Sequence, residues 1–208
     1  MPNFTDITGL AGVACAMIAA LLLLPGIAHT STKTVLSKTH RAILLGTVFV
    51  LMLVPFGAMP VAAYVRGVTG DLSITTLVLL CCALMKQWCD CVTAEGKQRR
   101  ALLMMIALFA LALYPMALGI GGYDPYRLGY GDPLFIFVLL LLVLFAWFLK
   151  FPLVVLCIAL ATLAWATGWY ESSNIWDYLI DPFVSFYALA VITIRGTKKY
   201  IEFRETRT

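Results

Sequence analysis

Apolar segments of about twenty residues follow one another from Ile7 to Arg195, and basic residues cluster in every second gap between them. A bilayer core of about 30 Å is crossed by roughly twenty helical residues, so each segment has the length of one span. Only 12% of the residues are charged and 62% are hydrophobic, which leaves too little polar surface to cover a soluble globule of this size. The sequence therefore predicts an all-α, polytopic membrane helical bundle, with residues 1–208 forming one transmembrane domain.

Seven spans emerge when hydropathy is averaged over windows of about nineteen residues. Their predicted ranges are 7–28, 42–65, 72–92, 101–120, 133–149, 152–170 and 175–195. Six spans stay an alternative, because the division between the fifth and the sixth depends on a tight hairpin at Lys150. The range 133–170 is far too long for one crossing, however, and Pro152 suits the first turn of a new helix.

The charges of the gaps predict how the chain is oriented. The basic gaps hold Lys33, Lys38 and Arg41, then Lys97, Arg99 and Arg100, then Lys150, and finally Lys198, Lys199, Arg204 and Arg207. The gaps between them hold Asp6, the Arg66 to Asp71 loop, Asp124, Arg127 and Asp132, and Glu171 with Asp177. Under the positive-inside rule the amino terminus lies outside and the carboxyl terminus is cytoplasmic. We expect a cell membrane, in the simplest case a bacterial inner membrane, and no cleaved signal peptide, because no positive stretch precedes the first apolar run.

The loop between the fourth and fifth spans is rich in turn formers and aromatic residues. Asp132 is placed to cap the fifth span ahead of Pro133, and Asp124 is placed to begin a turn ahead of Pro125. The tyrosines of this loop, Tyr126 among them, suit the aromatic belt at the headgroup level. Neither role needs Arg127, which could pair with Asp124 or Glu171 or could clamp an anion.

The segment from Trp169 to Pro182 contains the carboxylate that we single out. A helix that began at Pro182 would leave only about 14 residues before Arg195, roughly 20 Å, so the seventh span should start earlier, with Asn174 as its cap and Asp177 in its first turn. Asp181 would then lie inside the helix, beside a backbone that Pro182 loosens. Such a carboxylate usually faces a cavity, a partner charge or a substrate path. The alternative is a residue close enough to the interface to stay wet.

Prolines in the outward halves of three spans suggest where a cavity would open. Pro55 and Pro60 fall in the second span, Pro115 in the fourth and Pro182 in the seventh. Irregular backbone at membrane depth is tolerated where it is buried in protein or lines water, so an outward-opening cavity is one hypothesis. The other is that these prolines are ordinary, because proline is common in membrane helices.

The end of the third span contains four cysteines and two charges. Cys89 and Cys91 would point about 200° apart on a helix, and no histidine lies nearby, so we expect neither a metal site nor a cofactor. Lys86 and Asp90 are four residues apart and are expected to form an intramembrane ion pair near the cytoplasmic face. A proton or ion relay is the alternative for this pair.

Three classes of function remain. The first is a non-enzymatic accessory or assembly subunit of an envelope membrane complex, which would dock another membrane protein through its outer loops. The second is a small permease or flippase for a polar or anionic substrate, and the third is an enzyme that acts on a lipid-linked substrate. The candidate residues for binding a substrate or partner are Glu171, Asp124, Tyr126, Arg127, Asp132, Trp176, Asp177 and Asp181. We expect the lipid bilayer and another membrane or envelope protein as partners and no nucleic acid, with a homo-oligomer as an alternative.

Overall fold

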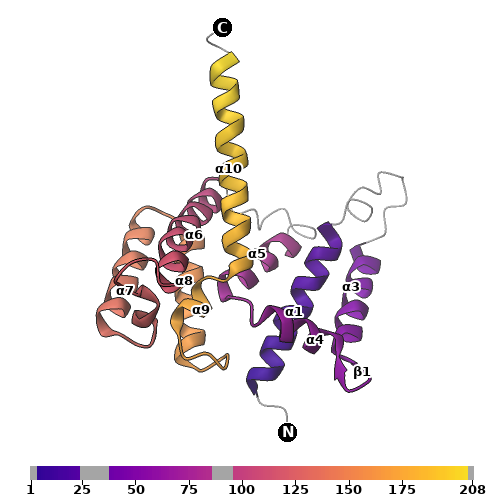
Figure 1. Ribbon diagram of the computed structural model, residues 1–208. Helices are drawn as coiled ribbons and strands as arrows, with labels where there is room; N and C mark the ends of the chain where they lie inside the picture. The colour runs from indigo at the N-terminus through magenta and orange to yellow at the C-terminus, as the bar shows by residue number, and fades with distance from the viewer. Residues whose placement is uncertain (1–3, 24–37, 86–95, 206–208) are drawn as a thin grey trace.

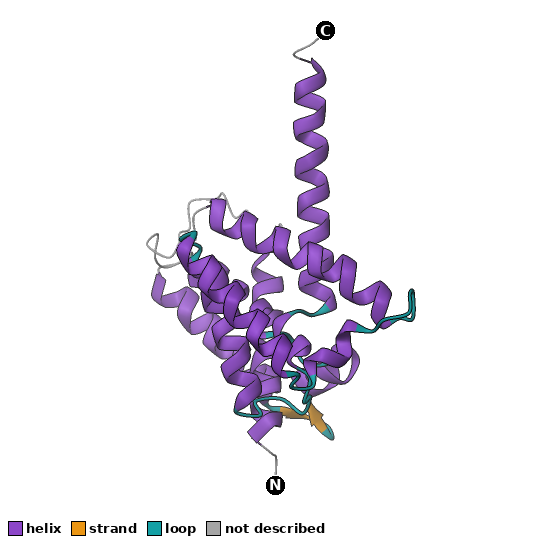
Figure 2. Ribbon diagram, turned by 90° about the vertical axis from the view of Figure 1, so that its left-hand side faces the viewer, coloured by secondary structure: helices purple, strands orange, loops and turns teal. Residues whose placement is uncertain are grey.

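The computed structural model describes residues 4–23, 38–85 and 96–205, which are mostly helical (Figures 1 and 2). The all-α prediction is confirmed, apart from one short hairpin of two strands. The elements are α1 (Phe4–Leu23), α3 (Lys38–Leu53), β1 (Pro55–Phe56), β2 (Met59–Pro60), α4 (Val61–Thr69), α5 (Ile74–Met85), α6 (Gly96–Ala117), the 3₁₀ helix η2 (Pro125–Gly129), α7 (Pro133–Phe148), α8 (Pro152–Ala166), α9 (Ile175–Leu179) and α10 (Pro182–Glu205).

Helix length separates α6 from the other apolar helices. Within the described residues, α6 alone is long and apolar enough to cross a membrane by length and composition. The apolar helices α7 and α8 have 16 and 15 residues, fewer than the roughly twenty that a crossing needs. Helix length and composition therefore support one crossing, and they do not support seven.

The second predicted span, 42–65, is not one helix. Helix α3 ends at Leu53, and an antiparallel hairpin follows in which Pro55 pairs with Pro60. Proline cannot donate the amide hydrogen that a continuing helix needs, and Gly57 adopts the left-handed backbone (φ 80°) that the turn requires. The chain becomes helical again only at Val61.

The last predicted span, 175–195, begins where expected, with Asn174 as the cap of Ile175, but it is not one helix and does not end at Arg195. The five-residue helix α9 stops at Leu179, and Ile180 is extended (φ −141°, ψ 146°). Helix α10 then begins at Pro182, the start that the length argument had excluded. That argument failed because the helix continues past Arg195 to Glu205 and has 24 residues, about 36 Å at 1.5 Å per residue.

The tight turn predicted at Lys150 is confirmed. Lys150 has a positive φ of 56°, and Pro152 is the first residue of α8. Helices α7 and α8 pack against each other as a hairpin. A left-handed residue at the tip reverses the chain there, and the proline starts the second helix because its missing N–H would be unpaired in any first turn.

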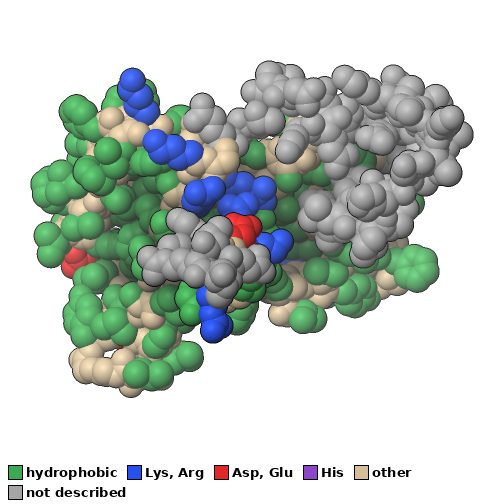
Figure 3. Space-filling model, turned by 90° about the horizontal axis from the view of Figure 1, so that it is seen from above, with side chains coloured by type: hydrophobic (Ala, Val, Ile, Leu, Met, Phe, Trp, Pro, Cys, Tyr) green, Lys and Arg blue, Asp and Glu red, His purple; other side chains and the backbone are tan. Residues whose placement is uncertain are grey.

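The described segments that connect the helices lie at two ends of the molecule, and segments that alternate along the chain contact each other at the same end. At one end, which we call the α9 end, Arg66 contacts Asp6 (Nη1 to Oδ1, 2.9 Å), and Asn174 donates to the carbonyl oxygen of Tyr126 (2.9 Å). At the opposite end the ammonium of Lys97 lies 5.9 Å from the ring centre of Phe151. Helix α10 runs from the α9 end to the opposite end, where Lys and Arg side chains gather (Figures 1 and 3).

Two apolar clusters hold the helices together. The larger one is built from α5 to α10 and includes Leu102, Ile106, Cys157, Tyr178 and Ala188, each at most 2% exposed. The smaller one joins α1, α3 and α4. Helix α1 also packs on α5, so the two clusters form one continuous body.

Candidate functional site: a pocket at the α9 end

Side chains of α9 fasten the loop between α6 and α7. Asn174 accepts a hydrogen bond from the backbone N–H of Trp176 (3.0 Å), as expected of a helix cap, while its amide nitrogen donates to Tyr126. The indole N–H of Trp176 donates to the carbonyl oxygen of Pro125 (3.1 Å). Trp176 is only 7% exposed, so it belongs to the interior and not to an interfacial belt.

The two predicted loop caps are confirmed. Asp124 accepts from the N–H of Tyr126 (3.0 Å), and Asp132 accepts from the N–H of Phe135 (3.0 Å). Each carboxylate satisfies an amide that the start of a helix leaves without an internal partner. Neither aspartate lines the pocket described below. Their role is to fix where η2 and α7 begin.

Asp177 is the acceptor for two hydroxyl groups. The phenol of Tyr126 donates to its two carboxylate oxygens (2.9 and 3.0 Å), and Ser172 donates to Oδ2 (2.5 Å). Burial and this hydrogen bond raise the pKa of Tyr126 above its usual value, so the phenol stays protonated and remains a donor at neutral pH. Sequence reasoning selected both residues but gave no reason for them to meet.

Asp181 is buried at the junction of two helices. Its Oδ1 accepts from the N–H of Val184 (2.8 Å), so it caps α10. Its Oδ2 accepts from the N–H and the hydroxyl of Ser73 (2.8 Å each) and from the hydroxyl of Thr76. Only 5% of Asp181 is exposed, so its carboxylate is almost fully enclosed by the protein. Its carboxylate lies at the amino ends of α5 and α10, where the helix dipoles favour a negative charge.

A pocket of about 370 Å³ opens beside these residues. Its wall is formed by the ends of α6 and α10, by α9 and by the segments that flank them. The lining residues are Asp71, Leu113, Tyr114, Tyr126, Tyr170, Ser172, Trp176, Asp177, Ile180, Asp181 and Pro182. Four predicted site residues therefore meet here: Tyr126, Trp176, Asp177 and Asp181. Of the prolines, Pro182 lines the pocket and Pro115 follows the lining residue Tyr114, whereas Pro55 and Pro60 are not in its wall.

An ion-pair network closes one side of the pocket, and sequence analysis missed it. The guanidinium of Arg66 binds both oxygens of Asp71 (2.7 and 3.0 Å), contacts Asp6 and lies 3.8 Å from Glu171. The hydrogen bond to Asp71 raises the pKa of Arg66, which therefore stays charged. A clue was present in the sequence, since Arg66 and Asp71 are the charged residues of one short outer gap.

Of the alternatives considered for Arg127, neither pairing, with Asp124 or with Glu171, forms in the structure. Its side chain is exposed and forms no ion pair within the described ranges, and Glu171 is approached by Arg66 instead. Ser73 and Thr76 were also missed, although a serine directly ahead of an apolar run, as at Ser73, is a recognisable helix start. The predicted pair of Lys86 and Asp90 lies outside the described residues.

We expect Arg66→Gln to lower the free energy of unfolding by about 2 kcal/mol, because three carboxylates would lose a half-buried, partly bidentate partner. The side chain of Arg66 is only 16% exposed, so solvent screens the network less than it screens a surface pair. The matched control is Arg127→Gln, an exposed arginine at the same end, which should change stability by less than about 0.5 kcal/mol. Thermal melting of the purified full chain in detergent measures both, and equal effects would contradict the network's role.

The described residues contain no group of three His, Cys, Asp or Glu side chains that could hold a metal ion. The wall of the pocket combines carboxylates, phenols and one indole with the apolar side chains of Leu113, Ile180 and Pro182. Comparison with protein-family models, with curated proteins and with solved structures finds no match to this chain.

Proposed function

We propose that this chain is a multi-pass protein of the cell membrane whose pocket faces outward and binds a small polar ligand, as a permease or flippase would. The observation that carries the proposal is the preformed pocket of about 370 Å³ at a break between two helices. Ligand sites are usually concave and largely preformed, with a few polar groups converging on them. In transporters they often lie where helices are interrupted.

The membrane setting has its own support. Side chains along α7 that would be buried in a soluble protein are exposed, including Phe137 (54%), Phe145 (61%) and Trp147 (68%). An apolar surface of this kind marks a lipid or protein contact. Connecting segments that alternate along the chain share one end of the molecule, and this arrangement supports seven crossings with the amino terminus outside. Crossings as short as α7 and α8 would be accommodated by local thinning of the bilayer, at a modest cost.

The lining of the pocket selects a class of ligand. Three carboxylates, Asp71, Asp177 and Asp181, reach its wall, and no Lys or Arg lines it. An anion would meet repulsion there, whereas a cation or a hydroxyl-rich group could donate hydrogen bonds. We therefore favour a cationic or donor-rich ligand over the anionic one that was among the sequence-based alternatives.

A thermal-shift experiment tests this function. The full chain in lipid nanodiscs is melted with ethylammonium, with glucose and with inorganic phosphate. We expect ethylammonium or glucose to raise the melting temperature because it binds the folded state, and phosphate to leave it unchanged. The shift should be lost in Asp177→Asn and kept in Asp124→Asn, an aspartate at the same end outside the pocket. A shift with phosphate alone, no shift with any probe, or equal shifts in both variants would overturn the proposal.

An accessory subunit is the second candidate, because part of the loop between α6 and α7 stays free for a partner. Tyr123 and Tyr130 are 55% and 60% exposed, and the Arg127 side chain is exposed with them. Tyrosine and arginine are common anchors of protein interfaces. Trp176 and Tyr126, which we had also assigned to docking, are engaged within the protein. Co-purification with a stoichiometric partner that depends on Arg127 would favour this role.

A further inference from the structure

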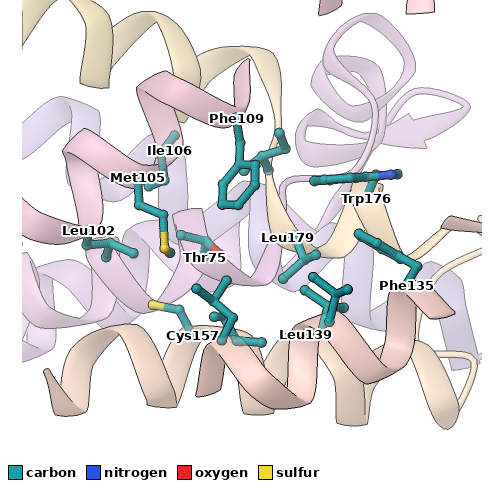
Figure 4. Close-up of a pocket in the computed structure, with 14 residues that line it drawn as sticks. Thr75, Leu102, Met105, Ile106, Phe109, Phe135, Leu139, Cys157, Trp176 and Leu179 are labelled. Carbon is teal, nitrogen blue, oxygen red and sulfur yellow. The ribbon is translucent and has the colours of Figure 1, made fainter. Parts of the chain in front are cut away.

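A second cavity, which we call the chamber, lies in the core next to the pocket. Its volume is about 60 Å³, and it is enclosed by α5, α6, α7, α8 and α9 (Figure 4). Thr75 is the one residue in its wall with a hydroxyl group, and the rest of the wall is almost wholly apolar. Much of that wall is formed by Leu102, Ile106, Phe109, Phe135, Leu139 and Cys157. A polar group placed there would lose its hydrogen bonds to water, so the chamber suits hydrocarbon.

The chamber and the pocket meet at one partition. Trp176 and Ile180 line both of them. Along α6 the two cavities also follow one another, because Phe109 lines the chamber and Leu113, one turn further on, lines the pocket. The pocket, whose wall includes carboxylates and phenols, and the almost wholly apolar chamber thus follow one another along one helix.

Trp176 forms the partition through its ring. The indole lies 4.7 Å from the ring of Phe135 and 6.0 Å from that of Phe109, centre to centre, and its nitrogen points away from the chamber (Figure 4). That nitrogen is occupied by the carbonyl oxygen of Pro125. The chamber therefore meets only the apolar part of the indole.

Part of the chamber wall contributed by α6 and α7 also belongs to the outer surface of the bundle. Phe109 (36% exposed) and Val138 (49%) line the chamber and contribute to the apolar surface as well. In a bilayer this surface would face acyl chains. A hydrocarbon chain can thus approach the chamber from lipid, while a polar group can approach the pocket from water.

We infer that the ligand is an amphiphile, with a cationic or hydroxyl-rich head in the pocket and a more distant part of its hydrocarbon chain in the chamber beyond Trp176. This inference rests on the proposed function, because the head must first bind in the pocket. The chamber holds roughly two groups of about 30 Å³ each, so it would take about two methylenes. Each buried methylene is worth about fourfold in affinity, so two methylenes give an expected gain of about fifteenfold for a chain long enough to enter.

The test compares ethylammonium with octylammonium on the full chain in nanodiscs. Cys157→Leu fills the chamber from its wall, and Cys15→Leu makes the same change in α1, away from the chamber. We expect octylammonium to bind about fifteenfold more tightly than ethylammonium in the wild type and in Cys15→Leu, and the ratio to fall to about one in Cys157→Leu. Partitioning of octylammonium into lipid is the same for all three proteins and cancels in the comparison.

The possible results separate the two proposals. Binding of ethylammonium with no gain for octylammonium, or with a gain that survives in Cys157→Leu, would overturn the amphiphile and leave the pocket standing. Failure of both amines to bind the wild type would overturn the amphiphile, and failure of glucose to bind as well would overturn the pocket itself. Should Cys157→Leu prove unstable, Val138→Phe narrows the chamber from the lipid side and should abolish the same gain.

Discussion

Asp181→Ala is expected to lower the free energy of unfolding by about 4 kcal/mol, because it would leave buried donors without an acceptor. The carboxylate satisfies donors from Ser73, Thr76 and Val184 and joins the starts of α5 and α10. Thermal or urea unfolding of the full chain in detergent measures the loss.

Two further variants sharpen the Asp181 experiment. Asp132→Ala removes a carboxylate that caps α7 through one hydrogen bond, so it should cost only about 1 kcal/mol. Asp181→Asn should fall between the two alanine variants, because its oxygen can still cap α10 while its NH₂ group faces the N–H of Ser73. If Asp181→Ala cost no more than Asp132→Ala, the carboxylate would not be joining the two helices and would instead be available to a ligand.

Gly129→Ala is expected to cost about 3 kcal/mol, because the added methyl group would overlap the cap of α9. A Cβ atom at this position would lie 1.8 Å from Oδ1 of Asn174 and 2.6 Å from Cδ1 of Trp176. Asn174 is fully buried, and both the oxygen and the nitrogen of its side-chain amide form hydrogen bonds, so it cannot move aside without losing one of them. The variant should also weaken ligand binding, because Trp176 lines the pocket.

The control for this prediction is Gly122→Ala in the same loop. A Cβ atom there would meet nothing within 4 Å, so the melting temperature should stay within a degree or two of the wild type. Melting followed by tryptophan fluorescence suits both variants. Equal melting temperatures for Gly129→Ala and Gly122→Ala would mean that η2 and α9 are not packed as closely as described.

The elements that sequence reasoning located correctly are those fixed by neighbours in the chain. Asp132 with Pro133, Asn174 with Trp176 and Lys150 with Pro152 each act within a single turn, so residue type and spacing predict them. The end of the second span was misplaced, and the break inside the seventh was missed, for a related reason. The apolar sequence continues through Pro55 and Ile180, but the hydrogen-bonded helix stops before each of them.

By itself the sequence determined the helical class, the alternation of charged gaps and the local caps, because these depend on composition and on contacts between near neighbours. Only the tertiary structure decided which side chains share the pocket. Asp181 meets Ser73 across 108 positions, and Asp177 meets Tyr126 across 51. Such meetings depend on how whole helices pack, and no local pattern encodes that packing. The same packing paired Arg66 with Asp6 and left Arg127 exposed.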